Sequence, residues 1–352
     1  MTAELASCSS EAMKGDPRLA MLDPSGISAQ CQVPIGLAAF ADCTGARIYR
    51  GPATIPAGAT AVLLVLDRPL ARCLEMLLSL QSSGKIVVVT FAESGNMPIA
   101  DLIDKPDGLR CFFEICRCAD AAVATTADSE EILRCSGARN VDFIPVPCPV
   151  GCPGWDFSVS PDRRRGIFVG TADFFPHYSN HVAALLSLRD LAGQLSEPVT
   201  VVRSDRRFDR RMLRQLRRRW PRGLLNVVPG PVPPDRLVQL MATHKVAYQL
   251  EWAGGAGQIA ALALLCKIPS VGGHGTTERI AFPGLCGVGR TTDELTDLVT
   301  GLIRNPKAAE AVTAAAGELA AAHLSPEQAR SRLVALVDRA AAGHGMRRAD
   351  TR

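Results

Sequence analysis

Short apolar runs alternate with segments of helical spacing along most of the chain. The clearest runs, residues 61–66 (AVLLVL) and 86–91 (IVVVTF), are almost entirely apolar. Continuous apolar runs of this length are typical of strands that are buried on both faces, as in parallel sheets. Residues 70–82 instead repeat their apolar positions at the spacing of a helix. The alternation therefore predicts an α/β fold in which helices cover parallel sheets.

The alternation occurs twice, and a break separates the two series. The first series predicts strands at residues 19–22, 61–66, 86–91, 121–125 and 141–145. Prolines and glycines then crowd residues 145–154, a composition that the interior of a sheet does not tolerate. The second series predicts strands at residues 166–170, 199–203, 225–228, 246–250 and 269–271. The pattern therefore predicts two Rossmann-like domains that face each other across a cleft.

The break and the composition of the ends divide the 352 residues into five parts. We expect a loose leader at 1–18, an N-terminal domain at 19–148, a linker at 149–160, a C-terminal domain with the terminal helices at 161–341, and a loose tail at 342–352. The length also favours two domains, and a hydrophobic fraction of 47% is ample for two cores.

Neither export nor metal binding is indicated by the composition. No apolar stretch is long enough for a transmembrane helix, and the first residues do not resemble a signal peptide. The 12 cysteines lack the spacing of a zinc site, so reduced, buried thiols are the simpler interpretation. We expect a cytoplasmic protein with no metal and no bound cofactor.

Glycine-rich turns follow several of the expected strands, and such turns bind phosphate when a helix begins directly after them. Gly26 follows the first strand, and an ordinary turn explains it equally well. Gly254–Gln258 precedes an apolar helix, and it is the best anion-binding turn in the chain. A third turn follows residues 269–271, where His274, Thr276, Thr277 and Glu278 offer polar side chains. A flexible loop and a solvated histidine are the plain alternatives for these two turns.

The second half of the chain resembles the C-terminal, donor-binding domain of GT-B glycosyltransferases, in particular the retaining family 4, also called group 1. The similarity rests on three segments in order, IFVGTADFFPHYSNHVAALLSL, NVVPGPVPPDRLVQLMATHKVAYQL and GGAGQIAALALLCKIPSVGGHGTTERI. In the first half, CADAAVATTADSEEILRCSGARNVDFIPVPCPV is similar to the last strand–helix–strand before that family's hinge. The resemblance covers about residues 20–310. One departure concerns the paired glutamates of the family signature, because Gly254 and Leu262 stand at their positions.

The resemblance implies an enzyme that binds a nucleoside-diphosphate sugar in the C-terminal domain and an acceptor in the N-terminal domain. It implies retention without a metal, with the departing phosphate taking the proton of the acceptor. The candidate donor-binding residues are Gly26, Gly170, Arg203, Glu251, Gly255, Gly257, Gln258, His274, Thr276, Thr277 and Glu278. Arg203 substitutes here for the basic pair of the family. Glu93, directly after a strand, is a candidate for contact with the acceptor, and a surface acid is the alternative.

The basic character of the chain is concentrated in one segment. Residues 203–222 contain ten arginines and two aspartates, so they carry +8, and the rest of the chain carries −4. Arg207, Arg210, Arg211, Arg214, Arg217 and Arg218 recur at helical spacing and share one face of a helix. A solvated helix, an anionic membrane surface at the inner face of the membrane, and duplex nucleic acid are the open interpretations.

Four functions therefore compete. A glycosyltransferase that uses a nucleotide sugar is the leading hypothesis. A catalytically silent GT-B scaffold that acts as a binding or partner subunit is the second, and the loss of both signature glutamates favours it. A sugar-nucleotide epimerase on the same scaffold and a polyanion-binding protein that uses the arginine helix complete the set.

Overall fold

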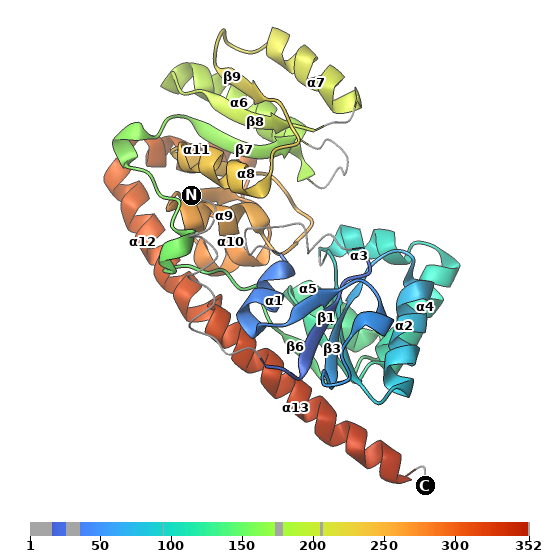
Figure 1. The fold of residues 1–352 in the computed structure, drawn as a ribbon. Coiled ribbons are helices and arrows are strands. Elements are labelled where there is room, and N and C mark those ends of the chain that lie inside the picture. The colour runs from blue at the N-terminus through green and yellow to red at the C-terminus, as the bar shows by residue number, and fades with distance from the viewer. Residues whose placement is uncertain (1–15, 26–35, 94, 173–178, 205–206, 351–352) are drawn as a thin grey trace. The chain divides into compact units, whose positions relative to one another are not determined.

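The computed structural model describes residues 16–25, 36–93, 95–172, 179–204 and 207–350. The chain forms two compact units (Figure 1). The first consists of Met1–Cys148 with Leu324–Arg352, and the second consists of Pro149–His323. The division falls where the prolines and glycines crowd, at the beginning of the expected linker. Residues 149–160 themselves are counted with the second unit, where Lys267 pairs with Asp156 at 2.6 Å.

The first unit contains a parallel sheet of six strands in the order β2-β1-β3-β4-β5-β6. The strands are β1 (Leu19–Leu22), β2 (Arg47–Tyr49), β3 (Ala61–Leu66), β4 (Ile86–Phe91), β5 (Ala121–Ala124) and β6 (Val141–Phe143). The helices are α1 (Ala38–Thr44), α2 (Leu70–Ser82), α3 (Asn96–Ile103), α4 (Pro106–Cys118), α5 (Ala127–Cys135) and α13 (Pro326–Asp350). Two apolar cores lie on the two faces of this sheet, one with side chains from α2, α4 and α5, the other with side chains from α1 and α13.

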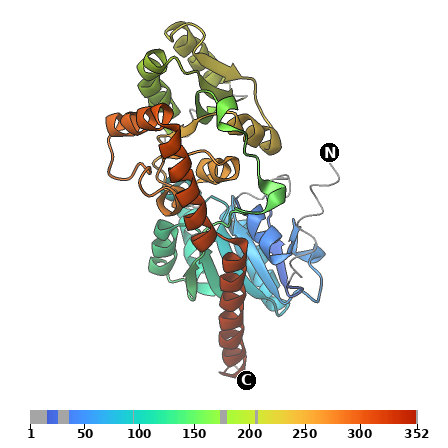
Figure 2. The same ribbon diagram turned by 90° about the vertical axis from the view of Figure 1, so that its left-hand side faces the viewer.

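The last helix, α13, belongs to the first unit, whereas the sequence predicts the terminal helices in the second domain. Its side chains Leu333, Leu336 and Val337 are buried in the same core as Met21 and Leu63 of the sheet. The apolar stripe of a helix shows which face is buried but not which sheet it covers, so the pattern alone does not assign it. The helix also continues to Asp350, where a loose tail is expected from residue 342. Figure 2 shows α13 from a second direction.

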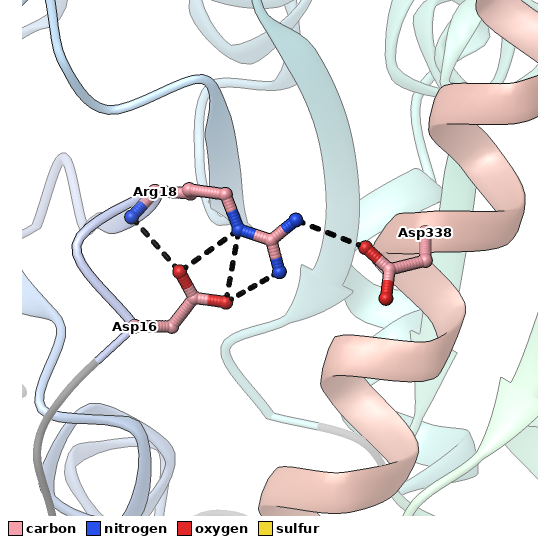
Figure 3. Close-up of polar contacts among 3 residues, drawn as sticks. All are labelled: Asp16, Arg18 and Asp338. Carbon is pink, nitrogen blue, oxygen red and sulfur yellow. Dashed lines mark hydrogen bonds and ion pairs between the residues drawn. The ribbon is translucent and has the colours of Figure 1, made fainter.

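Ion pairs fasten α13 to the sheet that it covers. The guanidinium of Arg18 lies 2.8 Å from the Asp16 carboxylate and 3.1 Å from that of Asp338 on α13 (Figure 3). The hydrogen bond from Arg18 lowers the pKa of Asp16. On β6, Asp142 accepts from Arg332 at 2.9 Å and from Arg339 at 3.0 Å. These partly exposed pairs orient the helix, while burial of its apolar face supplies most of the stabilisation.

The second unit contains a parallel sheet of five strands in the order β11-β10-β7-β8-β9. The strands are β7 (Ile167–Ala172), β8 (Val199–Arg203), β9 (Leu225–Val228), β10 (Val246–Gln249) and β11 (Ser270–Gly272). The helices are α6 (His181–Leu195), α7 (Arg207–Arg218), α8 (Pro234–Ala242), α9 (Gln258–Cys266), α10 (Thr276–Ala281), α11 (Thr292–Arg304) and α12 (Pro306–His323). The α/β class and the two Rossmann-like sheets are therefore confirmed.

Some elements escape the sequence pattern. The edge strand β2 has only three residues, none of them buried, and α3 carries a proline near its beginning. The sequence also predicts a helix at residues 27–40, and most of that range lies outside the described residues. The leader expected at 1–18 does so as well, except for Asp16–Arg18. Among the described residues, no helix combines the length and the apolarity that a membrane crossing needs.

Candidate functional site

The strand order of the second unit indicates where a ligand is expected to bind. The chain proceeds outward from β7 to β8 and β9, and it then returns to the other side of β7 to form β10 and β11. The order therefore reverses between β7 and β10. In open α/β sheets, ligands bind at the carboxyl ends of the strands beside such a reversal. Gly170, Arg203 and the turn after β10 all lie at this edge of the sheet.

Gly170 and Gln249 meet at the reversal. The register of β7 against β8 shifts between Phe168 and Gly170, and Gly170 has a φ of 100°, which favours glycine. The buried Gln249 amide donates to the carbonyl oxygen of Val169 at 2.9 Å. A Cβ at position 170 would lie 3.1 Å from that amide nitrogen. The glycine thus makes room for a side chain that satisfies a carbonyl at the bulge, which is a structural role.

The two glycine-rich turns pack directly against each other. The backbone N–H of Thr276 donates to the Gly255 carbonyl at 2.9 Å, and that of Thr277 donates to the Ala256 carbonyl at 3.2 Å. The Thr277 hydroxyl donates to the same Ala256 oxygen at 2.8 Å. A Cβ on Gly275 would lie 2.7 Å from the Cα of Gly257. Both threonines are therefore buried and bonded to protein, whereas the sequence predicts donors that face a sugar nucleotide.

The carboxyl group of Glu278 fills the space between these turns. The residue is 2% exposed, and its Oε2 atom has no hydrogen-bond partner among the described residues. A Cβ would lie 2.1 Å from Oε2 if placed on Gly257, and 2.3 Å if placed on Gly275. A Cβ on Gly273 would lie 2.9 Å from Oε1. We call Glu278 with Gly257, Gly273 and Gly275 the glycine cage.

Burial changes the protonation of Glu278. Desolvation, with a smaller contribution from the nearby Glu251 carboxylate, raises the pKa of this carboxyl to about 8, against the lowering effects of a backbone hydrogen bond and of Arg279. The side chain is therefore mostly a neutral acid at pH 7. It is covered by protein, whereas the sequence predicts a carboxylate that accepts hydrogen bonds from a ribose or sugar.

The remaining candidates of this edge are more accessible. Gln258 is exposed at the beginning of α9, and His274, Glu251 and Gly255 are partly exposed. Arg203 ends β8, and its Nε–H is buried without a hydrogen-bond partner among the described residues. A cationic donor and the exposed amino end of a helix each suit an anion. The donor-binding roles of these residues stay predictions.

The corresponding edge of the first unit carries carboxylates. Asp23 follows β1, Asp67 follows β3 and Glu93 follows β4, and these three strands include the neighbouring pairs β1–β3 and β3–β4. Asp23 is buried and accepts from the Ser25 backbone N–H at 3.0 Å, whereas Glu93 is exposed as a residue. Desolvation of the carboxyl group, together with Asp67 and Asp101, raises the pKa of Glu93. Gly26, the candidate donor-binding residue of this unit, lies outside the described residues.

Three residues at the strand ends were not among the predicted site residues. Gln249, Asp23 and Asp67 each lie at the end of a strand or directly after one. Their position after an apolar run is the signal that could have identified them, because polar groups there face the ligand-binding edge. Within the described ranges, no group of three or more His, Cys, Asp or Glu side chains is placed to hold a metal ion.

The likeness to known proteins lies in the structure and not in the sequence. No protein-family model and no curated protein sequence matches the chain. A solved structure named "Trehalose-6-phosphate from E. coli bound with UDP-2-fluoro glucose" is similar over 79% of this chain and 72% of its own, with a TM-score of 0.62 and 9% identity. An α,α-trehalose 6-phosphate synthase from Burkholderia multivorans is similar over 85% of this chain and 74% of its own, with a TM-score of 0.62 and 12% identity.

A sucrose-phosphate synthase from Thermosynechococcus elongatus is also similar, over 81% of this chain and 75% of its own, with a TM-score of 0.61 and 15% identity. At these identities the likeness shows the fold alone. The chain has the GT-B fold of these glycosyltransferases, with one Rossmann-like sheet in each unit. The narrower resemblance to family 4 is not decided by these structures and stays a prediction.

Proposed function

We propose that this chain is a glycosyltransferase that takes its sugar from a nucleoside-diphosphate sugar. The observation that carries the proposal is the Nε–H of Arg203, which is buried and has no hydrogen-bond partner among the described residues, at the carboxyl end of a strand in a GT-B fold. One of the similar structures was solved with UDP-2-fluoro glucose. A charge-assisted hydrogen bond to a phosphate oxygen would satisfy this donor.

The proposed chemistry follows from where charge develops. When the bond between the sugar and the diphosphate breaks, negative charge grows on the departing phosphate. In this proposal Arg203 and the amino end of α9 at Gln258 stabilise that charge, so no metal is needed. We further propose that the departing phosphate takes the proton of the acceptor hydroxyl, with retention at the sugar, and that the first unit holds the acceptor near Asp67 and Glu93.

A catalytically silent scaffold is the second candidate, and the glycine cage favours it. The Glu278 carboxyl occupies the turn that would otherwise present its N–H groups to a phosphate. Gly254 and Leu262 also stand where the resembled family has its paired glutamates. Such a protein would bind the nucleotide part without transferring a sugar.

Calorimetric titration with UDP, GDP and ADP tests the proposal. We expect one of them to bind, and we expect Arg203→Ala to weaken binding by about 10- to 100-fold, as for the loss of one charged hydrogen bond. Arg236→Ala is the matched control, because it removes the same charge from an exposed position on α8 and should leave affinity unchanged.

Turnover separates the two candidates. Release of UDP or GDP from the corresponding sugar nucleotide, weakened together with binding in Arg203→Ala, supports the transferase. Nucleotide binding with no sugar release, with or without added sugar phosphates, supports the scaffold. If none of the three nucleotides binds, the proposed donor site is wrong.

A further inference from the structure

The helix α7 presents a dense, one-sided field of positive charge. Its six outward residues Arg207, Arg210, Arg211, Arg214, Arg217 and Arg218 are all exposed. At 100° per residue they cover about 120° of the helix circumference over a length of about 16 Å. The guanidinium groups therefore spread in two dimensions, along the helix and around it.

The charges on this arginine face are not neutralised from within the helix. Its one acid, Asp209, is fully buried on the opposite side and accepts a hydrogen bond from the Ser204 hydroxyl. Within the part of the chain that the structure describes, none of the six arginines forms an ion pair. Clustered like charges repel each other, so such a face costs stability unless something outside the chain offsets it.

The apolar side of α7 is already used. Leu213 is 2% exposed and Leu216 is 9% exposed, so both pack into the unit, and Trp220 just beyond the helix is buried as well. Among the described side chains of 207–222 no aromatic residue is exposed. The arginine face itself would hold a partner by charge, through the phosphates of that partner.

We infer that the arginine face of α7 docks the protein onto an anionic lipid surface. The headgroup phosphates of a bilayer lie in a plane and diffuse laterally, so each guanidinium can recruit its own phosphate whatever the spacing of the arginines. Among the described side chains of α7, Gln215 is the one exposed residue that is not an arginine, so the helix offers little of the mixture of amide, hydroxyl and aromatic groups with which nucleic-acid-binding helices supplement phosphate contacts. Each arginine near an anionic surface contributes about 1 kcal/mol, so six suffice for reversible binding.

Sedimentation of the full chain with vesicles tests this inference without any sugar nucleotide, so its outcome is independent of the proposed function. We expect binding to vesicles of phosphatidylcholine with about 30% phosphatidylglycerol, and none to phosphatidylcholine alone. Binding should fall steeply as salt rises from about 50 to 300 mM, because screening shortens the reach of the charges.

Two charge-matched variants sharpen the test. Replacing Arg210, Arg214, Arg217 and Arg218 by Gln should weaken vesicle binding at least 100-fold, by the contribution of about 1 kcal/mol per arginine. The control replaces four exposed arginines elsewhere, Arg50, Arg139, Arg236 and Arg304, and should retain most of the binding. Circular dichroism and thermal unfolding establish that both variants fold.

Three results would overturn the inference. They are equal binding to neutral and anionic vesicles, equal losses in the two variants, and tighter binding to a DNA duplex than to anionic vesicles at the same phosphate concentration. The last result would assign the arginine face to nucleic acid.

Discussion

The carboxyl edges of the two sheets differ in the residues that follow their strands and in the exposure of their acids. In the first unit the strand ends carry Asp67 and Glu93, which keep contact with solvent. In the second unit the strand ends carry glycines, and the nearby carboxyl group, Glu278, is enclosed by them. The first edge can exchange protons and hydrogen bonds with a bound molecule, whereas the acid of the second edge is part of the packing.

The difference follows from what each turn must accommodate. The turns after β10 and β11 lie so close that a Cβ on Gly275 would meet the backbone of Gly257. Only glycine permits this approach, and the remaining space is filled by one side chain from α10. At the edge of the first unit Asp67 and Glu93 stay accessible to solvent, although Asp23 is buried. The glycines of the cage therefore have a structural role, which is to let the two turns pack closely.

The largest expected effect is the loss of stability caused by Gly275→Ala in the glycine cage. The added Cβ would lie 2.3 Å from Glu278 Oε2 and 2.7 Å from the Cα of Gly257, and a backbone atom cannot move aside cheaply. We expect the free energy of unfolding to fall by about 3 kcal/mol, the upper part of the range for overpacking. Chemical denaturation measures it.

Gly255→Ala is the matched control in the same pair of turns. The Cβ there would meet only the Glu251 Oε1 atom, at 3.4 Å, which is an ordinary contact. We expect a change within about 0.5 kcal/mol. Equal losses in the two variants would show that the cage is not tightly packed.

The substitution Glu278→Gln should change how stability depends on pH. The folded protein holds the Glu278 proton up to a pKa of about 8, whereas the unfolded chain releases it near 4.5. Between these values the folded state binds more protons, so stability decreases as pH rises from about 5 to about 8. Above that range the enclosed charge costs on the order of a few kcal/mol.

Gln keeps the size and shape of the side chain but cannot ionise, so the variant should lose this part of the pH dependence and be more stable than the wild type at pH 9. Thermal unfolding at pH 5, 7 and 9 measures the effect. Asp128→Asn removes a partly exposed acid of α5 and serves as the control. Parallel pH curves for wild type and Glu278→Gln would mean that the carboxyl group is solvated.

The sequence predicts the sheets of both units far better than their site. The run Ala61–Leu66 appears at the expected residues because a strand buried on both faces must be apolar throughout. The glycine-rich turns are also where they are expected. What occupies them is not predictable locally, because Glu278 reaches Gly257 across 21 positions of the chain, through tertiary packing alone.

The sequence also does not predict which unit α13 belongs to. Its apolar residues predict a buried face, but the chain leaves the first unit at Cys148 and re-enters it only at Leu324. The backbone N–H of Cys148 donates to the carbonyl of Leu324 at 2.8 Å, so exit and return are adjacent. The spacing of apolar residues within a helix does not show to which unit the chain returns. The arginine face of α7 could be predicted, because it depends only on the spacing of residues within one helix.

The smallest expected effect concerns Glu93 and tests the accessible edge of the first unit. Its carboxyl should titrate above the ordinary range of glutamate, because partial desolvation and the negative charges of Asp67 and Asp101 disfavour ionisation. Asp67→Asn removes one of these charges, so the pKa of Glu93 should move back toward its usual value, while stability changes by no more than about 0.5 kcal/mol. NMR titration of the side-chain carboxyl measures the shift, and Asp107→Asn, an exposed acid at the beginning of α4, should leave it unchanged. If Glu93 instead titrates together with unfolding, its carboxyl is enclosed as Glu278 is, and the contrast between the two edges disappears.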